Sequence, residues 1–376
     1  MRVLHVYRTY FPDTQGGLEE VIRQICLGSG ENGVVSRVFT LSEEPFPRVL
    51  PRVEADVLRV RKTFEIASCG FALTGLRRFA KAVEWADIVH YHYPWPFSDL
   101  MYLAAGRAKP AVLTYHSDIV RQKILLSLYR PLMKRYLGAM DRIVATSPNY
   151  FATSEVLNEF ADMVEVIHIG LNEPSYPAID EQNRNLAAAR QRYGSDFFLF
   201  VGVLRYYKGL HILLEAVRGA SYKVVIVGAG PVESELRQQA KDLGLENVTF
   251  AGFVPDREKM ALFQLCRAVV FPSYLRSEAF GVTLLEGAMS SRPLISAEVG
   301  SGTSHVNVHG ETGLVVPPSD TAALRAAMDE LFNDEVKARK MGKNARLRYE
   351  QLFTGSAMGA RYAEVYRDVI RVKKAL

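Results

Sequence analysis

Two glutamates, Glu278 and Glu286, bracket an otherwise largely apolar run in the stretch EAFGVTLLE. A carboxylate is costly to bury without a partner, so the pair either points into water or holds a polar ligand. The preceding strand is expected to end near Ser273, and a helix is expected to begin at Gly281. On one continuous helix, residues eight positions apart lie about 80° apart around the axis, so both carboxylates could lean toward one side.

The start of this expected helix offers donors for an anion. The backbone N–H groups of Gly281, Val282 and Thr283 have no intrahelical acceptor, which suits a phosphate group. Carboxylates would be repelled by that phosphate, so we expect them to hold hydroxyl groups on either side of it. A ribose and a hexose flanking a diphosphate fit this pattern. The alternative is a glutamate near the helix start that complements the helix dipole, together with a surface glutamate.

Two cations follow another expected strand, in FLFVGVLRYYKGLHILLEA. The strand ends near Val203, Arg205 and Lys208 come next, and Gly209 precedes a helix. Arginine binds phosphate oxygens in a bidentate way, and lysine acts as a point charge, so the stretch suits a diphosphate. A solvated turn with incidental charges is the alternative.

Three glycine-rich segments were tested by their context. Gly16 and Gly17 lie ahead of an expected helix, where the backbone can approach a phosphate, although a flexible turn explains them equally well. GSGENG, residues 28–33, follows a helix, so it is interpreted as a helix end and turn rather than a dinucleotide fingerprint. GAGPVE, residues 228–233, follows a strand but has Glu233 in place of the third glycine.

The elements that must position these residues alternate between short apolar strands and amphipathic helices. Helices are expected in EEVIRQICLGS, HILLEAVRG, SELRQQAKDLG and TAALRAAMDELFND. Such alternation predicts the α/β class, with doubly wound parallel sheets covered by helices. Strands are expected in RVLHVY, VSRVFTL, DIVHYHY, PAVLTYH, RIVAT, VEVIHI, FLFVGVL, KVVIVGAG, VTFAGF, AVVFPS, RPLISA and GLVV.

The pattern breaks in residues 171–194, where two prolines and a polar run precede a new strand. We therefore predict two Rossmann-like domains of similar size, residues 1–175 and 176–355. The final helix, residues 356–376, is expected to pack back on the first domain. Ligands of such sheets bind outside the carboxyl ends of the strands, so a cleft between the two domains is the expected site.

Composition excludes several classes of protein. The 376 residues are 48% hydrophobic and 23% charged, which is normal for a globular protein. Cys26, Cys69 and Cys266 are far apart, which disfavours a disulfide scaffold or a structural zinc site and favours a cytoplasmic setting. The net charge of +5 is too weak to imply nucleic acid. No signal peptide and no run of roughly 18 apolar residues for a membrane span is found.

Taken together, these motifs resemble those of the retaining glycosyltransferases of family 4, which have the GT-B fold of two facing Rossmann-like domains. The resemblance covers essentially the whole chain. It is carried by the spacing of Glu278 and Glu286, the RYYKG loop, the paired glycines after the first strand, and the ATS that closes RIVATS.

The resemblance implies roles for particular side chains. Glu286 would hold the ribose hydroxyls of the donor, and Glu278 would contact the transferred sugar. Arg205 and Lys208 would neutralise the diphosphate leaving group. His116, in LTYHSD, matches the histidine that this family places beside the donor sugar, where it either positions the sugar or acts as a base. A histidine that merely satisfies the backbone at a strand end is the alternative.

The resemblance also implies contacts by the backbone. The base would be read at Phe253 and Val254, in FAGFVPD. Many family members end the strand before the basic loop with Gly-Arg, whereas this chain has Val203 there, and we expect Arg205 to substitute. The backbone contacts to the sugar and phosphates would come from Gly16, Gly17, Phe280, Gly281, Val282 and Thr283.

The implied reaction is a metal-independent hexosyl transfer with retention of configuration, in which the leaving phosphate assists a front-side attack. The chain has no Asp-x-Asp motif at a strand end, and no cofactor or metal is expected. The chain resembles mannosyl- and rhamnosyltransferases of bacterial O-antigen assembly, which implies a GDP-mannose or GDP-D-rhamnose donor. A UDP-hexose donor is the alternative. An NAD-dependent oxidoreductase and a non-catalytic nucleotide-sugar-binding subunit are more distant ones.

A basic, apolar stretch, IVRQKILLSLYRPLMKRYLGAM, covers residues 119–140. It could lie on an anionic membrane and approach an undecaprenyl-diphosphate-linked or oligosaccharide acceptor, which would place the enzyme on the cytoplasmic face of the inner membrane. Ordinary core helices with basic outer faces are the alternative. Pro131 predicts two shorter helices rather than one. His90 and His92, in DIVHYHY, cannot be told apart from core histidines.

Overall fold

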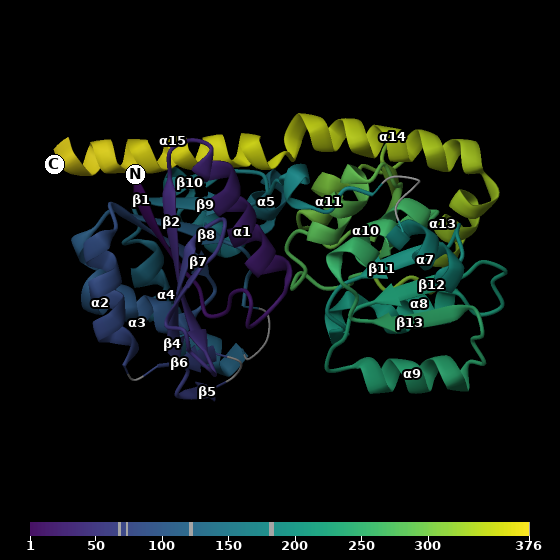
Figure 1. Ribbon diagram of the computed structural model, residues 1–376, viewed down its shortest axis with the longest axis horizontal. Coiled ribbons are helices and arrows are strands. Elements are labelled where there is room, and N and C mark those ends of the chain that lie inside the picture. Colours follow the sequence, from purple (N-terminus) through teal and green to yellow (C-terminus); the bar gives the residue numbers. More distant parts are fainter. Residues whose placement is uncertain (67–68, 73, 120–122, 180–183, 376) are drawn as a thin grey trace. The chain divides into compact units, whose positions relative to one another are not determined.

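The chain forms two compact units (Figure 1). The computed structural model describes residues 1–66, 69–72, 74–119, 123–179 and 184–375. Unit 1 comprises Met1–Gly170 with Gly355–Leu376, and unit 2 comprises Leu171–Thr354. Unit 2 therefore begins slightly before the boundary predicted from the sequence. The reason is local, because the N–H of Leu171 donates to the carbonyl of Phe353 over 2.9 Å and so joins the two ends of unit 2.

In its described residues, unit 1 is built on an eight-stranded sheet of order β10-β9-β8-β7-β1-β2-β4-β3. Its neighbouring strands are parallel except for β3, which pairs antiparallel with β4. A small antiparallel pair, β5 and β6, lies outside this sheet. The strands are β1 (Arg2–Val6), β2 (Val35–Ser42), β3 (Val49–Pro51), β4 (Asp56–Arg61), β5 (Phe64–Ile66), β6 (Cys69–Phe71), β7 (Ile88–Tyr93), β8 (Ala111–Tyr115), β9 (Arg142–Ala145) and β10 (Val164–Val166).

Unit 2 contains, within the described part of the chain, a six-stranded sheet of order β13-β12-β11-β14-β15-β16. All its pairs are parallel. The four strands β11, β12, β14 and β15 are buried along their whole length, which explains their continuous apolar sequences. The strands are β11 (Phe198–Val201), β12 (Val224–Val227), β13 (Val248–Gly252), β14 (Ala268–Phe271), β15 (Leu294–Ala297) and β16 (Gly313–Val316).

Helices connect the parallel strands in both units, so the predicted α/β class with two doubly wound parallel sheets is confirmed. Unit 1 has α1 (Gly17–Gly30), α2 (Gly75–Trp85), α3 (Pro96–Ala105), α4 (Lys123–Leu137), α5 (Pro148–Thr153), α6 (Glu155–Asn158), α15 (Gly355–Ala375), η1 (Gly106–Ala108) and η2 (Ala161–Met163). Unit 2 has α7 (Arg184–Tyr193), α8 (Leu210–Ala216), α9 (Glu233–Asp242), α10 (Asp256–Leu265), α11 (Val282–Met289), α12 (Thr303–Val306), α13 (Thr321–Asn333), α14 (Glu335–Leu352), η3 (Glu173–Ser175) and η4 (Tyr206–Lys208).

Each sheet has one point where the strand order reverses. In unit 1, β1 lies between β2 and β7, and in unit 2, β11 lies between β12 and β14. The loops after the two central strands leave in opposite directions at such a point and open a crevice at the carboxyl edge of the sheet. The RYYKG loop follows β11 and the EAFG loop follows β14, so both lie at the switch point of unit 2.

Helix α15 packs against α1 through glycines (Figure 1). A Cβ atom on Gly28 would lie 2.1 Å from the carbonyl oxygen of Gly355, and one on Gly359 would lie 1.9 Å from the carbonyl carbon of Gly28. The interpretation of GSGENG as a helix end and turn is confirmed, because α1 ends at Gly30 and a turn follows. Gly28 lies inside α1 and allows the close helix contact, and Gly33, with φ of 78°, takes the turn.

The prediction of two short helices around Pro131 is wrong. The described residues form one helix, α4, with Pro131 inside it. Proline removes one backbone hydrogen bond, but Met133, Tyr136 and Leu137 are buried in the same helix, and this packing outweighs the loss. Residues 120–122 of the basic stretch lie outside the described residues. Among the described helices, none combines the length and apolar character needed to cross a membrane.

Candidate functional site

Lys208 ends η4, in the loop after β11. The next residue, Gly209, has φ of 70°, and a Cβ atom there would lie 2.0 Å from the carbonyl oxygen of Pro272. Only glycine allows this approach, so the β11 loop packs directly on the loop after β14. The ammonium group of Lys208 then reaches Glu278 and lies 4.6 Å from the centre of the Phe271 ring. Two predicted site residues that lie far apart in sequence are thus in contact.

Glu278 is buried, with 8% of its surface exposed, although it lies in a loop. Its Oε2 atom accepts a hydrogen bond from Lys208 and another from the hydroxyl of Ser273 over 3.2 Å. Both partners come from the carboxyl ends of neighbouring strands. The alternative of a surface glutamate is therefore wrong for Glu278, because a cation and a hydroxyl stabilise its charge inside the protein.

Helix α11 starts at Val282 without a side-chain cap. Gly281 precedes it with φ of 87°, a backbone conformation that favours glycine. The hydroxyl of Thr283 donates to the carbonyl of Val201 over 3.0 Å and holds the helix start beside the end of β11. The Phe280 ring packs in the core, where a Cβ atom on Gly302 would lie 2.4 Å from it. The side chains of Phe280 and Thr283 are therefore engaged inside unit 2, and the backbone N–H groups of this segment are what it offers to a phosphate.

Glu286 lies on α11, is 4% exposed, and pairs with Lys259 of α10 over 2.8 Å. Lys259 also contacts Asp256 over 3.1 Å. Burial alone would lower the pKa of Lys259, but the nearby carboxylates of Glu286 and Asp256 outweigh it and raise this pKa. The lysine is therefore charged at neutral pH. Sequence reasoning missed it, although its position shortly after FAGFVPD, at the start of a helix, was a usable signal.

The other residues predicted in unit 2 line the same edge of the sheet. Arg205 is exposed ahead of η4 and forms no ion pair with the other described residues. Phe253 and Val254 follow β13; the Phe253 side chain is 68% exposed, whereas that of Val254 is buried. The contact between this backbone and the base stays a prediction from the family resemblance.

The glycines of GAGPVE have a packing role. Gly228 has φ of 125°, and a Cβ atom there would lie 2.0 Å from the carbonyl oxygen of Gly202. A Cβ atom on Gly230 would lie 2.4 Å from the carbonyl oxygen of Leu204. These glycines hold the loop after β12 against the loop that carries Arg205, so they shape the candidate site without a dinucleotide fingerprint.

In unit 1, Gly16 and Gly17 form the start of α1, after β1. A Cβ atom on Gly16 would lie 2.6 Å from Oε2 of Glu19, whose Oε1 accepts a hydrogen bond from Thr14 over 3.0 Å. A carboxylate that sequence reasoning did not consider therefore already lies at this helix end. It complements the positive end of the helix dipole, and a phosphate would have to share that position with it.

His116 follows β8 and is 6% exposed. Its backbone N–H donates to the carbonyl of Tyr93 over 3.1 Å, a main-chain bond that continues the pairing of β7 with β8 and does not depend on the side chain. Its ring also forms a hydrogen bond, because Nε2 lies 3.0 Å from Nδ1 of His92. Burial lowers the pKa of His116 to about 3, so the ring is neutral at physiological pH.

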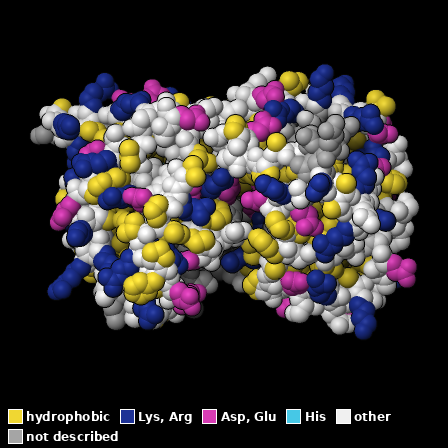
Figure 2. Space-filling model, in the orientation of Figure 1, with side chains coloured by type: hydrophobic (Ala, Val, Ile, Leu, Met, Phe, Trp, Pro, Cys, Tyr) yellow, Lys and Arg dark blue, Asp and Glu magenta, His cyan; other side chains and the backbone are white. Residues whose placement is uncertain are grey.

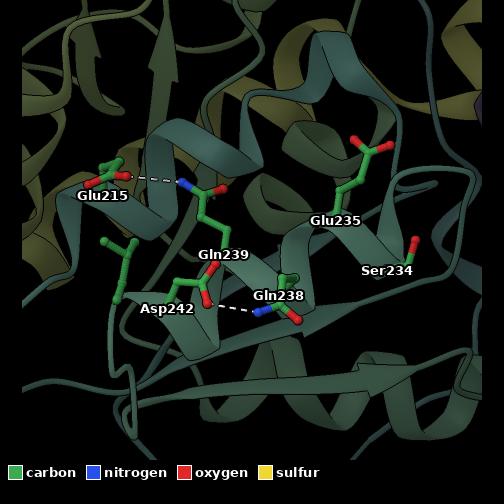
Figure 3. A pocket seen from close by; sticks show the side chains of 7 residues that line it. Glu215, Ser234, Glu235, Gln238, Gln239 and Asp242 are labelled. Carbon is green, nitrogen blue, oxygen red and sulfur yellow. Dashed lines mark hydrogen bonds between the residues drawn. The ribbon is translucent and has the colours of Figure 1, made fainter.

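An open hollow of about 550 Å³ lies on the outer surface of unit 2, on α8 and α9 (Figure 3). Its polar side chains bond to one another: Gln239 donates to Glu215 over 3.2 Å, and Gln238 donates to Asp242 over 2.7 Å. Among the described residues that line it there is no lysine or arginine. A diphosphate requires cations, so this hollow is not a suitable site for one.

Both halves of the chain match models of known families. Residues 15–173 match Glycosyltransferase Family 4, and residues 182–348 match Glycosyl transferases group 1. The D-rhamnosyltransferase WbpZ of Pseudomonas aeruginosa is 55% identical over 94% of this chain and 92% of its own length. The O-antigen chain mannosyltransferase C of Escherichia coli is 47% identical over 99% of this chain and 100% of its own.

Solved structures share this fold. Sucrose-phosphate synthase from Thermosynechococcus elongatus has a TM-score of 0.80 at 22% identity, covering 99% of both chains. Anabaena HepE in complex with UDP-glucose has a TM-score of 0.78 at 19% identity, covering 98% of this chain and 100% of that one. At these identities the likeness concerns the fold alone.

Proposed function

Because this chain belongs to the family 4 glycosyltransferases and has the GT-B fold, we propose that it transfers a hexose from a nucleotide-sugar donor to a precursor of a bacterial polysaccharide. Mannose or D-rhamnose, carried by GDP, is the proposed sugar. The support is the identity to relatives named for D-rhamnose and for O-antigen mannose. A UDP-hexose is the second candidate for the donor.

One observation carries the proposal for the donor site. At the switch point of unit 2, two buried glutamates, each paired with a lysine, flank the uncapped start of α11. Cations and backbone N–H groups bind phosphate, and carboxylates accept hydrogen bonds from sugar hydroxyls, so the segment suits a diphosphate between two sugars. In this proposal Glu286 holds the ribose and Glu278 contacts the hexose.

The reaction forms a bond between the anomeric carbon and the acceptor oxygen, and it breaks the bond from that carbon to the distal phosphate. The acceptor hydroxyl gives its proton to an oxygen of the leaving diphosphate, and attack on the same face retains the configuration. Lys208, Arg205 and the N–H groups at the start of α11 stabilise the negative charge that develops on the diphosphate.

The same cations supply the charge that a metal ion supplies in other transferases, so we propose that no metal is needed. Activity in excess EDTA is the test. Survival of turnover supports the proposal, whereas loss that is restored by Mg²⁺ or Mn²⁺ contradicts it. Gly16 and Gly17, for the donor phosphates, and His116, for the sugar, remain predictions from the family resemblance.

We propose an undecaprenyl-diphosphate-linked or oligosaccharide acceptor, reached at the cytoplasmic face of the inner membrane. Basic residues of α4, such as Arg130 and Lys134, and the 77% exposed Leu128 support contact with an anionic membrane, although both cations also pair with Glu159. Elsewhere on unit 1, Figure 2 shows exposed hydrophobic side chains among lysines and arginines over the region of β4 to β6. Sedimentation with anionic and neutral vesicles tests this contact.

The donor is tested by thermal shift with GDP-mannose, GDP-D-rhamnose, UDP-glucose and NAD, followed by linkage analysis of the product. Stabilisation by a GDP-sugar and its transfer with retention support the proposal. Stabilisation by NAD alone would favour an oxidoreductase, and binding of a nucleotide-sugar without turnover on any lipid-linked acceptor would favour a non-catalytic subunit.

A further inference from the structure

Three buried histidines of unit 1 form one hydrogen-bonded chain. His5 lies on β1, His92 on the neighbouring strand β7, and His116 directly after β8, the next strand. Nδ1 of His5 lies 3.2 Å from Nε2 of His92, and Nδ1 of His92 lies 3.0 Å from Nε2 of His116. These two hydrogen bonds engage both ring nitrogens of His92 and leave Nδ1 of His116 for a ligand.

All three rings are neutral at physiological pH. Burial lowers the pKa of His5 and of His116 to about 3, and it lowers the pKa of His92 well below its usual value, with smaller effects from the neighbouring histidines. A neutral imidazole carries one N–H group and one lone pair. Each ring therefore has one nitrogen that donates and one that accepts. The hydrogen bonds can then run either from His5 through His92 to His116 or in the opposite direction.

The direction in which the three histidines donate their hydrogen bonds is decided by His5, at the end of the row away from His116. Nε2 of His5 is buried and has no hydrogen-bond partner among the described residues. A buried N–H group without an acceptor is rarer than an acceptor that is not satisfied. The proton of His5 therefore lies on Nδ1 and is donated to His92. His92 in turn donates from its own Nδ1 to Nε2 of His116.

We propose that His5 and His92 are positioning residues that hold His116 in the tautomer with its proton on Nδ1. In this form His116 presents an N–H donor to an oxygen of the transferred sugar. It does not act as a general base, because its lone pair on Nε2 is engaged by His92. The inference rests on the proposed contact between His116 and the donor sugar, and it decides between the two roles left open for that residue.

A fourth histidine provides a matched control. His90 lies on the same strand as His92 and is equally buried, but its nitrogens bond elsewhere: Nδ1 lies 2.7 Å from the hydroxyl of Tyr366 and Nε2 lies 2.7 Å from that of Thr114. Thr114 is in turn 2.9 Å from the hydroxyl of Tyr362. This second network fastens α15 to the sheet and does not include His116.

A metal site is the rival explanation. Ligand atoms of His5, His90 and His92 all lie within 4.8 Å of one another, the grouping that a metal ion requires. However, no carboxylate or thiolate belongs to that group in the described part of the chain, so a divalent ion would be buried with three neutral ligands. To bind the metal, His90 would also have to break one of its two hydrogen bonds, either that of Nδ1 to Tyr366 or that of Nε2 to Thr114.

The tautomers can be read directly by NMR of the full-length protein labelled with ¹⁵N-histidine. In the wild type we expect a protonated Nδ1 and a bare Nε2 on His116. His5→Phe removes the first donor, so His116 should become a mixture of tautomers. His5→Asn, whose amide can replace that donor, should restore the single form, and His90→Gln should leave it unchanged. A proton on Nε2 of wild-type His116, or no change in His5→Phe, would overturn the proposal.

Kinetics separate this inference from the proposed function. His92→Phe should lower kcat by roughly tenfold to a hundredfold, the range known for groups that orient metal-bound histidines, with little change in KM for the nucleotide-sugar. His90→Gln should not lower kcat in this way. If the wild type transfers no sugar, the proposed function fails although the tautomer stands. If the purified wild type contains stoichiometric zinc, and both His5→Phe and His90→Gln lose it, the three histidines form a metal site. That result overturns this inference but leaves the proposed function intact.

Discussion

At the residue scale, each of the two site glutamates is held by its own lysine. Glu278 pairs with Lys208 and Glu286 pairs with Lys259, and all four side chains are largely buried. A buried carboxylate needs such a partner, because removing one member of the pair leaves an uncompensated charge. Each lysine therefore compensates the charge of its glutamate in the absence of a ligand, and a donor must compete with or join these pairs.

Lys208→Met tests the cation beside the leaving group. The variant keeps the length of the side chain but removes its charge, so turnover should fall by about 10²–10³, the usual cost of removing one electrostatic stabiliser of a transition state. Steady-state kinetics with the donor measures this effect. Lys337→Met is the matched control, because it removes a lysine paired with Glu330 on the exposed surface of the same unit. Equal kcat values in both variants would remove Lys208 from the site.

Glu286→Gln tests the ribose contact. A hydrogen bond to a charged group contributes about 1.5–3 kcal/mol, so losing the charge should weaken binding of the nucleoside diphosphate by roughly tenfold to a hundredfold. Isothermal titration calorimetry gives this affinity. Glu235→Gln, an exposed glutamate of the hollow on α9, is the control and should bind normally. Unchanged affinity of Glu286→Gln would contradict its role.

The buried histidines should make stability depend on pH. The unfolded chain binds protons as the pH falls below about 6.5, whereas folded His5 and His116, with pKa values of about 3, do not. Their contribution to the free energy of unfolding is thus complete above pH 6.5 and is lost as the pH falls toward 3. Each histidine lowers this free energy by at most about 1.4 kcal/mol per pH unit in that range.

Asp99 opposes this trend, because burial raises its pKa to about 8. Comparing the wild type with His5→Phe cancels that contribution. Urea denaturation at pH 7, 6 and 5 should show a smaller loss of stability in the variant than in the wild type. Parallel pH profiles would mean that His5 is not held neutral.

At the element scale, the strands β11, β12, β14 and β15 of unit 2 could be predicted because each is a buried, continuous apolar run. In unit 1, β4 was missed. Its sequence DVLRVR alternates with charged residues and its partner β3 is short and antiparallel, so neither has the pattern of a buried parallel strand.

The close contact between α1 and α15 should make α1 sensitive to substitution at Gly28 but not at Gly30. Gly28→Ala should destabilise the protein by about 1–3 kcal/mol, because the new methyl group meets backbone atoms of α15 that cannot move aside easily. Gly30→Ala is the control: no atom lies within 4 Å of its Cβ position, so alanine there should be neutral or slightly stabilising. Urea denaturation of both variants measures the difference. Equal stabilities would show that the helices do not need this close approach.

At the scale of the whole molecule, the alternation of strands and helices predicted the α/β class, and the break in this pattern predicted two domains. Motifs at strand ends predicted Lys208, Glu278 and Glu286 as candidate site residues, whereas His116, Phe253 and Val254 came from the family resemblance. The pairs between residues distant in sequence could not be predicted. Lys259 of α10 pairs with Glu286 of α11, and His5 meets His92 because β1 neighbours β7. Strand order and helix packing decide such contacts, and neither is written in a local pattern.

Unit 2 is one continuous segment whose ends are fastened to each other. The N–H of Leu171 donates to Phe353 over 2.9 Å, the hydroxyl of Tyr349 donates to the carbonyl of Leu171 over 2.8 Å, and Arg346 bonds Glu173 over 2.7 Å. We therefore expect the fragment of residues 171–354 to fold alone, with a cooperative urea transition followed by circular dichroism. It should bind a nucleoside diphosphate without transferring sugar, and Glu286→Gln in the fragment should weaken that binding as in the full chain. A fragment that unfolds without cooperativity would show that unit 2 depends on unit 1, since its own sheet and closed ends would then be insufficient for stability.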